Sequence, residues 1–175
     1  MVARYDPQKD HFNFIHAMGI LKEEGYHFTC CLVGRDLNKD NKTLVDEIAN
    51  FNLTKNILLL DQRLDVPVIM NGIDIHVLSS AYGEAFPNVV AESMSCATPN
   101  VVTDVGDAGF IVGDTGKVVT PRSPEKLAQA IRVFLITYEN DPVKWSENCE
   151  NAFIRARDNF DIKNMIEKYH FVWGI

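Results

Sequence analysis

Long apolar runs, paired cysteines and an excess of positive charge are all missing from this 175-residue sequence. No apolar stretch approaches the roughly 20 residues that a helix needs to cross a bilayer. The four cysteines include no C-x-x-C pair, and a strand would direct Cys30 and Cys31 to opposite faces, so reduced thiols of a cytoplasmic protein are the simplest interpretation. Seventeen basic against 24 acidic residues leave a formal charge of -7, which argues against nucleic acid as the main partner.

The sequence also lacks a signal peptide and a recognisable metal-binding pattern. Residues 1–9 are of mixed polarity, whereas a secretory leader needs an apolar core. Val2 and Ala3 have the character of a strand whose beginning is missing, so we expect an excised domain with a further region upstream. No D-x-D pair occurs, which removes the usual carboxylate bridge to a divalent cation in sugar-transferring enzymes, and we expect a site without a metal. His16 and His76 have no partners at ligand spacing and are expected to be structural.

What the sequence does contain is a regular alternation of strand-like and helical segments. Its length and apolar share of 46% fit one soluble domain with a real core. Apolar residues at helical spacing predict helices over residues 10–24, 43–51 and 88–96, from Pro124 onward behind Ser123, and in two stretches between 142 and 173 that we expect to cover one edge of the sheet. Short apolar runs predict strands over residues 28–33, 57–60, 73–78, 100–103 and 117–119, the first two buried on both faces. This alternation requires parallel pairing, so we expect an α/β fold with a doubly wound, Rossmann-like parallel sheet.

Ligands of doubly wound sheets bind beyond the carboxyl ends of the strands, which directs attention to the loops after residues 3, 33, 60, 78 and 103. Arg4 and Lys9 follow the first of these ends, Gly34 the second and Arg63 the third. A guanidinium and a mobile ammonium together can neutralise a diphosphate that would otherwise need a metal ion. Taken alone, an Arg and a Lys five positions apart usually form an ordinary solvated surface.

The loop over residues 83–88 leads from a predicted strand into a predicted helix that begins near Pro87 or Asn88. The free N–H groups and positive end of such a helix attract anions and hydroxyl-rich ligands. Pro87 cannot donate a hydrogen bond and fixes the backbone at the helix start, so the expected donors are the N–H groups of Phe86, Asn88 and Val89. The plain alternative is a capped helix with no ligand.

Two carboxylates flank this helix start, Glu84 in the loop and Glu92 about one turn inside the helix. Both can reach one pocket, where a carboxylate can accept hydrogen bonds from sugar hydroxyls. Two other classes remain open: a glycoside hydrolase that uses these two groups as acid and base, and a flavodoxin-like regulatory or interaction domain without a ligand.

Several motifs, in order, resemble the retaining glycosyltransferases of family 4. The opening resembles the R-x4-K segment of their C-terminal domain, and the next strand end resembles their V-G loop. The later segments resemble the turn beneath the base, the E-x7-E signature, and the T-D-V-G-D and G-D-T-G elements of one bacterial subgroup. In this chain these motifs are residues 2–10, 32–34, 60–63, 79–94 and 100–116. Asp61 and Ala85 depart from the pattern, since family members more often have glycine at both places.

The resemblance implies the C-terminal half of a two-domain GT-B glycosyltransferase, with residues 1–175 as the nucleotide-sugar donor-binding domain and the N-terminal acceptor domain absent. It implies that Arg4 and Lys9 hold the donor diphosphate, that Glu92 binds the ribose and that Glu84 binds the transferred sugar. Backbone groups complete the donor site, at Gly34, Arg63, Phe86, Pro87, Asn88 and Val89.

The resemblance also implies a mechanism and a setting. A retaining transfer of this kind proceeds by front-face attack without a metal or a protein nucleophile, the leaving diphosphate taking the acceptor proton. The expected substrate is a UDP- or GDP-linked sugar with no further cofactor, used in bacterial polysaccharide or glycoconjugate synthesis. The full-length enzyme is expected to be cytoplasmic with peripheral membrane association, and the fragment alone is expected not to turn over.

Overall fold

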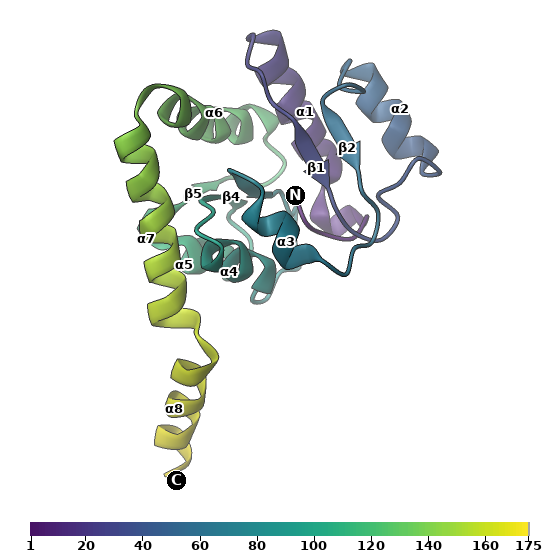
Figure 1. Ribbon diagram of the computed structural model, residues 1–175. Coiled ribbons are helices and arrows are strands. Elements are labelled where there is room, and N and C mark those ends of the chain that lie inside the picture. The colour runs from purple at the N-terminus through teal and green to yellow at the C-terminus, as the bar shows by residue number, and fades with distance from the viewer. Residues whose placement is uncertain (175) are drawn as a thin grey trace.

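The computed structural model describes residues 1–174 and contains short strands alternating with helices (Figure 1). The strands are β1 (Cys30–Leu32), β2 (Ile57–Leu59), β3 (His76–Leu78), β4 (Asn100–Thr103) and β5 (Lys117–Val119). The helices are α1 (His11–Glu23), α2 (Lys42–Asn50), α3 (Val66–Asn71), α4 (Asn88–Ser95), α5 (Ala108–Val112), α6 (Pro124–Asn140), α7 (Pro142–Phe160) and α8 (Ile162–Trp173). Two 3-10 turns, η1 (Pro7–Lys9) and η2 (Gly113–Thr115), complete the order.

All strand pairs are parallel. β1 pairs with β2, Cys30 opposite Ile57, and β4 lies between β3 and β5 in a second ladder. The expected strand character of the chain start is confirmed, because Val2 forms a parallel bridge with Val33 on β1. Met1 joins the two ladders: its ammonium donates to the carbonyl of Cys31, and its sulfur lies 3.7 Å from the hydroxyl oxygen of Ser79, just after β3.

Helices cover both faces of the β3–β4 pair, which confirms the doubly wound architecture. Successive residues of a strand point to opposite faces. Val77 and Val101 therefore join a core built mainly from α1, α2, β1 and α6, whereas Leu78 and Val102 join a second core built from α4, α5 and α7. Figure 1 shows the same division, with α1 and α6 on one side of β4 and β5 and with α4 and α5 on the other.

Two expectations about packing were wrong, and two short helices were not foreseen. β2 is not buried on both faces, because Leu58 at its centre is 47% exposed. The two short helices α3 and α5 were not expected, since five or six residues are too few to show helical periodicity. The last two helices do not cover the sheet edge together: α7 packs against α4 and α6, while α8 has no buried residue and extends away from the body (Figure 1).

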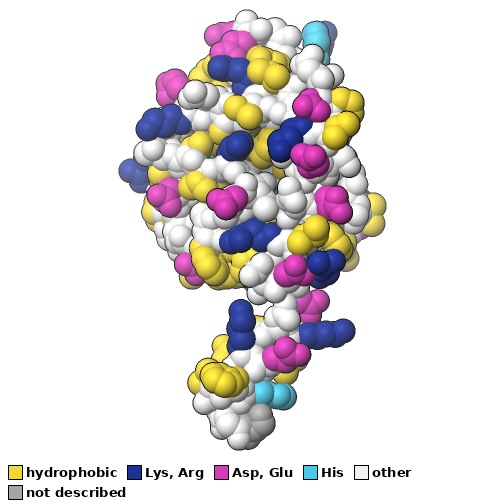
Figure 2. All heavy atoms as spheres, turned by 90° about the vertical axis from the view of Figure 1, so that its left-hand side faces the viewer, with side chains coloured by type: hydrophobic (Ala, Val, Ile, Leu, Met, Phe, Trp, Pro, Cys, Tyr) yellow, Lys and Arg dark blue, Asp and Glu magenta, His cyan; other side chains and the backbone are white. Residues whose placement is uncertain are grey.

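The face formed by α7 carries acidic and basic side chains interspersed, and α8 projects below it with apolar groups at its tip (Figure 2). Among the described residues, no helix combines the length and apolar character required to cross a bilayer.

Candidate functional site

Backbone conformations that favour glycine or a short polar residue gather at the carboxyl ends of the strands. Gly34 has a φ of +150°, and a Cβ on it would lie 2.1 Å from the carbonyl oxygen of Ala3. Its N–H donates to the carbonyl of Asp61 at 2.9 Å, so three strand ends meet at this glycine. Asp61 itself has a φ of +52°, which explains why glycine is common there and why aspartate is tolerated. Its carboxylate also accepts from the amide of Asn38 at 3.0 Å.

The 3-10 turn η1 fixes Lys9 at the edge of the sheet. The carboxylate of Asp6 caps the turn by accepting from the N–H of Gln8 at 2.9 Å, and this bond, reinforced by Arg4, lowers the pKa of Asp6. The hydroxyl of Ser79 donates to the carbonyl of Lys9 at 3.0 Å. The N–H of Ala81 donates to the carbonyl of Gln8 at 2.8 Å, so the turn is tied to the segment that follows β3.

Lys9 and Glu84, 75 residues apart, form a largely buried ion pair. The ammonium of Lys9 donates to Oε1 of Glu84, and the hydroxyl of Ser80 donates to the same oxygen at 2.6 Å. Only 14% and 7% of the two side chains are exposed. The carbonyl of Ser80 is held in turn by the hydroxyl of Thr103 at 2.6 Å, so β4 supports the pair. The structure thus brings together two of the three predicted catalytic side chains.

Arg4 lies beside this pair but remains exposed. Its Nε contacts the carboxylate of Asp6 at 3.1 Å, and its Nη2 donates to Oε1 of Gln8 at 3.3 Å. The amide nitrogen of Gln8 donates onward to the carbonyl of Gly83 at 2.8 Å. Gln8 therefore connects Arg4 to the loop that carries Glu84. Sequence reasoning missed this role, and its only signal was the position of Gln8 inside the R-x4-K segment.

The segment Gly83 to Pro87, which we call the donor loop, leads into the start of α4, where backbone N–H groups are available to a ligand. Pro87 is the N-cap of α4, with φ of -72° and ψ of 92°. Within residues 1–174, the N–H groups of Phe86, Asn88 and Val89 donate to no protein group. The positive end of α4 and these three N–H groups can therefore bind an anionic or hydroxyl-rich ligand.

The loop after β4 supports the donor loop from behind. A Cβ on Gly106 would lie 2.2 Å from the carbonyl oxygen of Glu84, and Gly106 has a φ of +56°, so a residue with a side chain would displace the donor loop. The N–H of Asp107 donates to the carbonyl of Ala85 at 2.8 Å. The T-D-V-G-D element thus contributes backbone packing to the site.

Glu92 and Arg63 are exposed, and no contact in the described chain joins their side chains to Lys9 or Glu84. Glu92 lies on α4 close enough to Cys96 that its charge, after burial, helps to raise the pKa of that thiol. The guanidinium of Arg63 binds Asp65 at 2.7 and 2.8 Å, which raises the pKa of Arg63 and leaves its main chain for any contact with a base. Placement of both residues in one donor pocket stays a prediction.

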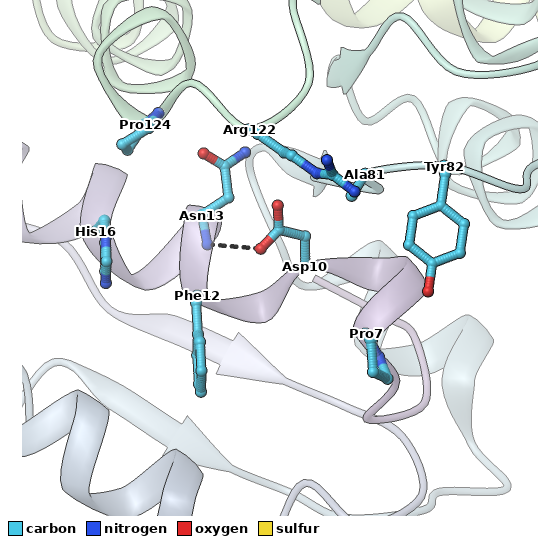
Figure 3. A pocket seen from close by; sticks show the side chains of 9 residues that line it. All are labelled: Pro7, Asp10, Phe12, Asn13, His16, Ala81, Tyr82, Arg122 and Pro124. Carbon is cyan, nitrogen blue, oxygen red and sulfur yellow. Dashed lines mark hydrogen bonds between the residues drawn. The ribbon is translucent and has the colours of Figure 1, made fainter.

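A hollow of about 400 Å³ lies next to the donor loop, between the start of α1 and the start of α6 (Figure 3). The side chains of Asp10, Tyr82 and Arg122 approach it from three segments, and Asp10 caps α1 by accepting from the N–H of Asn13 at 3.2 Å. Tyr82, which lines this hollow, directly precedes Gly83, so the hollow borders the donor loop.

His76 and His16 both have contacts within the fold. His76 is fully buried, its Nδ1 hydrogen-bonds to Oδ1 of Asn100 at 2.7 Å, and burial lowers its pKa to about 3. His16 on α1 pairs with Glu47 on α2. In the described part of the chain, no three His, Cys, Asp or Glu side chains lie close enough together to hold a metal ion, and all four cysteines are free.

Comparison with known proteins gives one family. Residues 1–152 match the model of the family described as glycosyl transferases group 1.

The similar proteins include both sequences and solved structures. The chain is 26% identical over 174 residues to the Escherichia coli UDP-Gal:alpha-D-GlcNAc-diphosphoundecaprenol alpha-1,3-galactosyltransferase, covering 96% of this chain and 43% of that protein. The crystal structure of Anabaena Alr3699/HepE in complex with UDP superimposes with a TM-score of 0.86 at 26% identity, covering 99% of this chain and 47% of the other. The C-terminal domain of a Francisella tularensis glycosyl transferase group 1 family protein shares the fold, with a TM-score of 0.73 at 19% identity, covering 91% and 83% of the two chains. The chain therefore spans less than half the length of the first two.

Proposed function

The chain belongs to the glycosyl transferases group 1 family, and we propose that it is the part of such an enzyme that binds the nucleotide-sugar donor. One observation carries the proposal: a largely buried ion pair joins Lys9 of η1 to Glu84 of the donor loop, which ends at the free N–H groups of the α4 start. The ammonium of Lys9 and the N–H groups can donate hydrogen bonds to the phosphates of a nucleotide-sugar, and the carboxylate of Glu84 can accept them from its hydroxyls.

The roles of the side chains follow from their charge and exposure. Arg4 is accessible and can meet the diphosphate directly, whereas Lys9 must share its ammonium between the phosphates and Glu84. Glu84 can accept hydrogen bonds from the sugar with its second oxygen. Glu92 would bind the ribose, and the backbone at Gly34 and Arg63 would frame the base.

We propose a UDP-linked sugar as the first donor to test, with GDP-linked sugars second. Support comes from the solved Anabaena structures with UDP, with UDP and glucose and with UDP-glucose, which are 25–26% identical to this chain, and from the UDP-Gal transferase of Escherichia coli. These names describe those proteins, and the sugar and base of this chain follow only by analogy.

The proposed mechanism is a retaining transfer without a metal. Arg4, Lys9 and the start of α4 would stabilise the negative charge that develops on the leaving diphosphate. Because Lys9 is already held by Glu84, and Ser80 donates to the same oxygen of Glu84, the site needs little rearrangement to receive the donor. The leaving diphosphate would take the acceptor proton, so no protein nucleophile is required.

The acceptor would be bound by a further domain of the whole enzyme, as the greater length of the relatives suggests. We propose a glycan or lipid-linked acceptor in bacterial polysaccharide or glycoconjugate synthesis, at the cytoplasmic face of a membrane. The chain alone would bind donor without turnover. The geometry does not support the hydrolase alternative, since Glu84 contacts Lys9 and Ser80, and within residues 1–174 no hydrogen bond or ion pair joins Glu84 to Glu92.

Calorimetry on the 175-residue chain tests the proposal. We expect UDP-glucose and UDP to release heat on binding, with unchanged affinity in EDTA. Lys9→Met should weaken UDP binding at least tenfold, because a charge-assisted bond to phosphate is lost. Lys144→Met is the matched control, since Lys144 lies exposed on α7 and pairs with Glu147. Absence of heat with every nucleotide, or equal effects of the two variants, would contradict the donor site; a requirement for Mg²⁺ would contradict only the metal-free mechanism.

A further inference from the structure

Three aromatic rings link the donor loop to the end of α7. Phe160, the last residue of α7, makes an edge contact with Phe86 of the donor loop, with ring centroids 5.7 Å apart at 67°. It makes a similar contact with Phe110 on α5, at 6.0 Å and 74°. Such edge-to-face pairs are favourable beyond the area they bury.

Arg155 fixes the ring of Phe160 from the other side. Its guanidinium lies 5.9 Å over that ring and donates to the carbonyls of Ile111 and Phe110, at 2.7 and 2.5 Å, at the end of α5. A Cβ on Gly113 would lie 2.5 Å from the guanidinium carbon, so this glycine leaves room for the arginine. Phe160 is therefore held by α5 as well as by its own helix.

The backbone of α7 is anchored one turn earlier. Ala152 and Ala156 are 0% and 1% exposed and belong to the core with α4 and α5. Phe160 lies four residues after Ala156 and therefore on the same face of the helix. Its ring approaches the donor loop from a rigid base.

The donor loop is also held by one hydrogen bond from a side chain and one from a backbone N–H. Gln8 holds the carbonyl of Gly83, and Asp107 holds the carbonyl of Ala85. The side chain of Phe86 is 39% exposed, and among the described residues its one aromatic contact is Phe160. This ring pair is therefore the aromatic anchor of the last stretch of the loop before Pro87.

We propose that Phe160 is a positioning residue of the donor site: by holding Phe86, it sets the backbone whose N–H groups begin α4. Phe160 does not touch the donor itself. The inference rests on the proposed function for its consequence in binding, but the positioning can be measured without a ligand.

Hydrogen exchange of the free chain tests the positioning. The useful amides are those of Val90 and Asp107, which donate to the donor-loop carbonyls of Pro87 and Ala85. Phe160→Leu should speed the exchange of both amides by about threefold to tenfold, the range that corresponds to one aromatic pair. Phe153→Leu, on the same helix beside Arg157, should change neither amide. Equal exchange in both variants would overturn the proposal.

A double-mutant cycle tests the consequence for binding. Phe160→Leu and Phe86→Leu should each weaken UDP-glucose binding about threefold to tenfold, and the double variant should be no weaker than either single variant. Phe160→Tyr, which keeps the ring, should restore parental affinity. The positioning role would be contradicted if the losses of binding free energy add up in the double variant. It would also be contradicted if the loss of affinity follows the loss of thermal stability and not the presence of an aromatic ring at position 160. Failure of the parent chain to bind any nucleotide would refute the donor proposal, while hydrogen exchange would still decide the role of Phe160.

Discussion

The two ends of β3 and β4 both carry buried polar side chains, but they use them differently. At the carboxyl ends, Ser80 and Thr103 lead outward to the Lys9–Glu84 pair, whose neighbours Arg4 and Tyr82 are exposed. At the amino ends, His76 and Asn100 are directed inward. Buried polarity is therefore common to both ends, and access to solvent distinguishes the candidate site.

The amino-end network centres on Asn100, and within residues 1–174 it leaves Nε2 of His76 without a hydrogen-bond partner. Oδ1 of Asn100 contacts His76 at 2.7 Å and accepts from the hydroxyl of Ser93 at 2.9 Å, and its Nδ2 donates to the carbonyl of Thr98 at 2.9 Å. All four residues are at most 2% exposed. This arrangement supplies hydrogen bonds to buried polar groups, so we expect its contribution to be to stability. The comparison predicts that substitutions at the two ends separate stability from binding.

The largest effect on stability is expected at the amino end. Asn100→Ala removes the partner of His76 and Ser93 and should lower the free energy of unfolding by about 4 kcal/mol, because two buried polar groups lose a hydrogen bond. Urea denaturation measures the loss, with Asn140→Ala on the exposed end of α6 as control. Affinity for UDP, measured below the melting point, should not change. A loss below about 1 kcal/mol, or weakened UDP binding, would break the distinction between the ends.

Low pH should destabilise the fold through two buried histidines, His76 at the amino ends of the strands and His11 near their carboxyl ends. Burial lowers the pKa of His76 to about 3 and that of His11, beside Tyr5 and Lys9, to about 4. Because the unfolded chain binds protons near pH 6.5 and the folded chain does not, stability is fully present above pH 6.5 and falls as the pH drops toward 4, by on the order of 3 kcal/mol for each histidine. Denaturation at pH 7, 5.5 and 4 measures the fall.

His11→Phe provides the matched variant for this pH series. His11 is 2% exposed, and neither ring nitrogen has a hydrogen-bond partner in the described part of the chain. Phenylalanine should therefore be tolerated, and part of the acid-induced loss of stability should disappear. Acid loss of the same size in the variant would show that His11 is not one of the responsible groups.

The intermediate effect is expected at the ion pair. Glu84→Gln leaves the ammonium of Lys9 buried without its counter-charge and should cost about 2 kcal/mol of stability. The same change frees Lys9 for phosphate. UDP affinity should therefore stay the same or rise, while the additional affinity for UDP-glucose over UDP should disappear. Calorimetry with both ligands measures the difference, and parallel losses for the two ligands would contradict the assignment of Glu84 to the sugar.

The smallest effect on stability is expected at Arg4, whose contacts are on the surface. Arg4→Gln should change the free energy of unfolding by less than about 0.5 kcal/mol, as is usual for an exposed pair. UDP affinity should nevertheless fall about tenfold, since the lost guanidinium would have bound phosphate. The control is Arg157→Gln on α7, which removes a comparable exposed pair with Asp158. Equal UDP affinity in the two variants would remove Arg4 from the site.

The alternation of elements could be predicted from the sequence because each buried strand carries its own apolar run. β4 and β5 have the predicted bounds, and the parallel topology follows from the intervening helices. The orientation of α8 could not be predicted, since an amphipathic helix shows an apolar stripe whether or not anything covers it.

The candidate site could be predicted by location but not by contact. The loops at the strand ends contain the predicted residues, and the free N–H groups of α4 begin where the sequence suggested. The pairing of Lys9 with Glu84 joins residues 75 positions apart, and only the fold brings them together. The support from Gly106 and Phe160 is likewise tertiary, because neither has a local sequence signal for a contact with the donor loop.

The central claim is that the carboxyl ends of the strands, and not the amino ends, bind the nucleotide-sugar. Titration of the ¹⁵N-labelled chain with UDP-glucose, followed through its backbone amide resonances, tests it most directly. We expect the amide chemical shifts to change at residues 4–9, 34 and 84–92 and to stay unchanged at residues 74–76 and 98–100. Shifts at the amino ends, or none at residues 84–92 under saturating UDP-glucose, would contradict it.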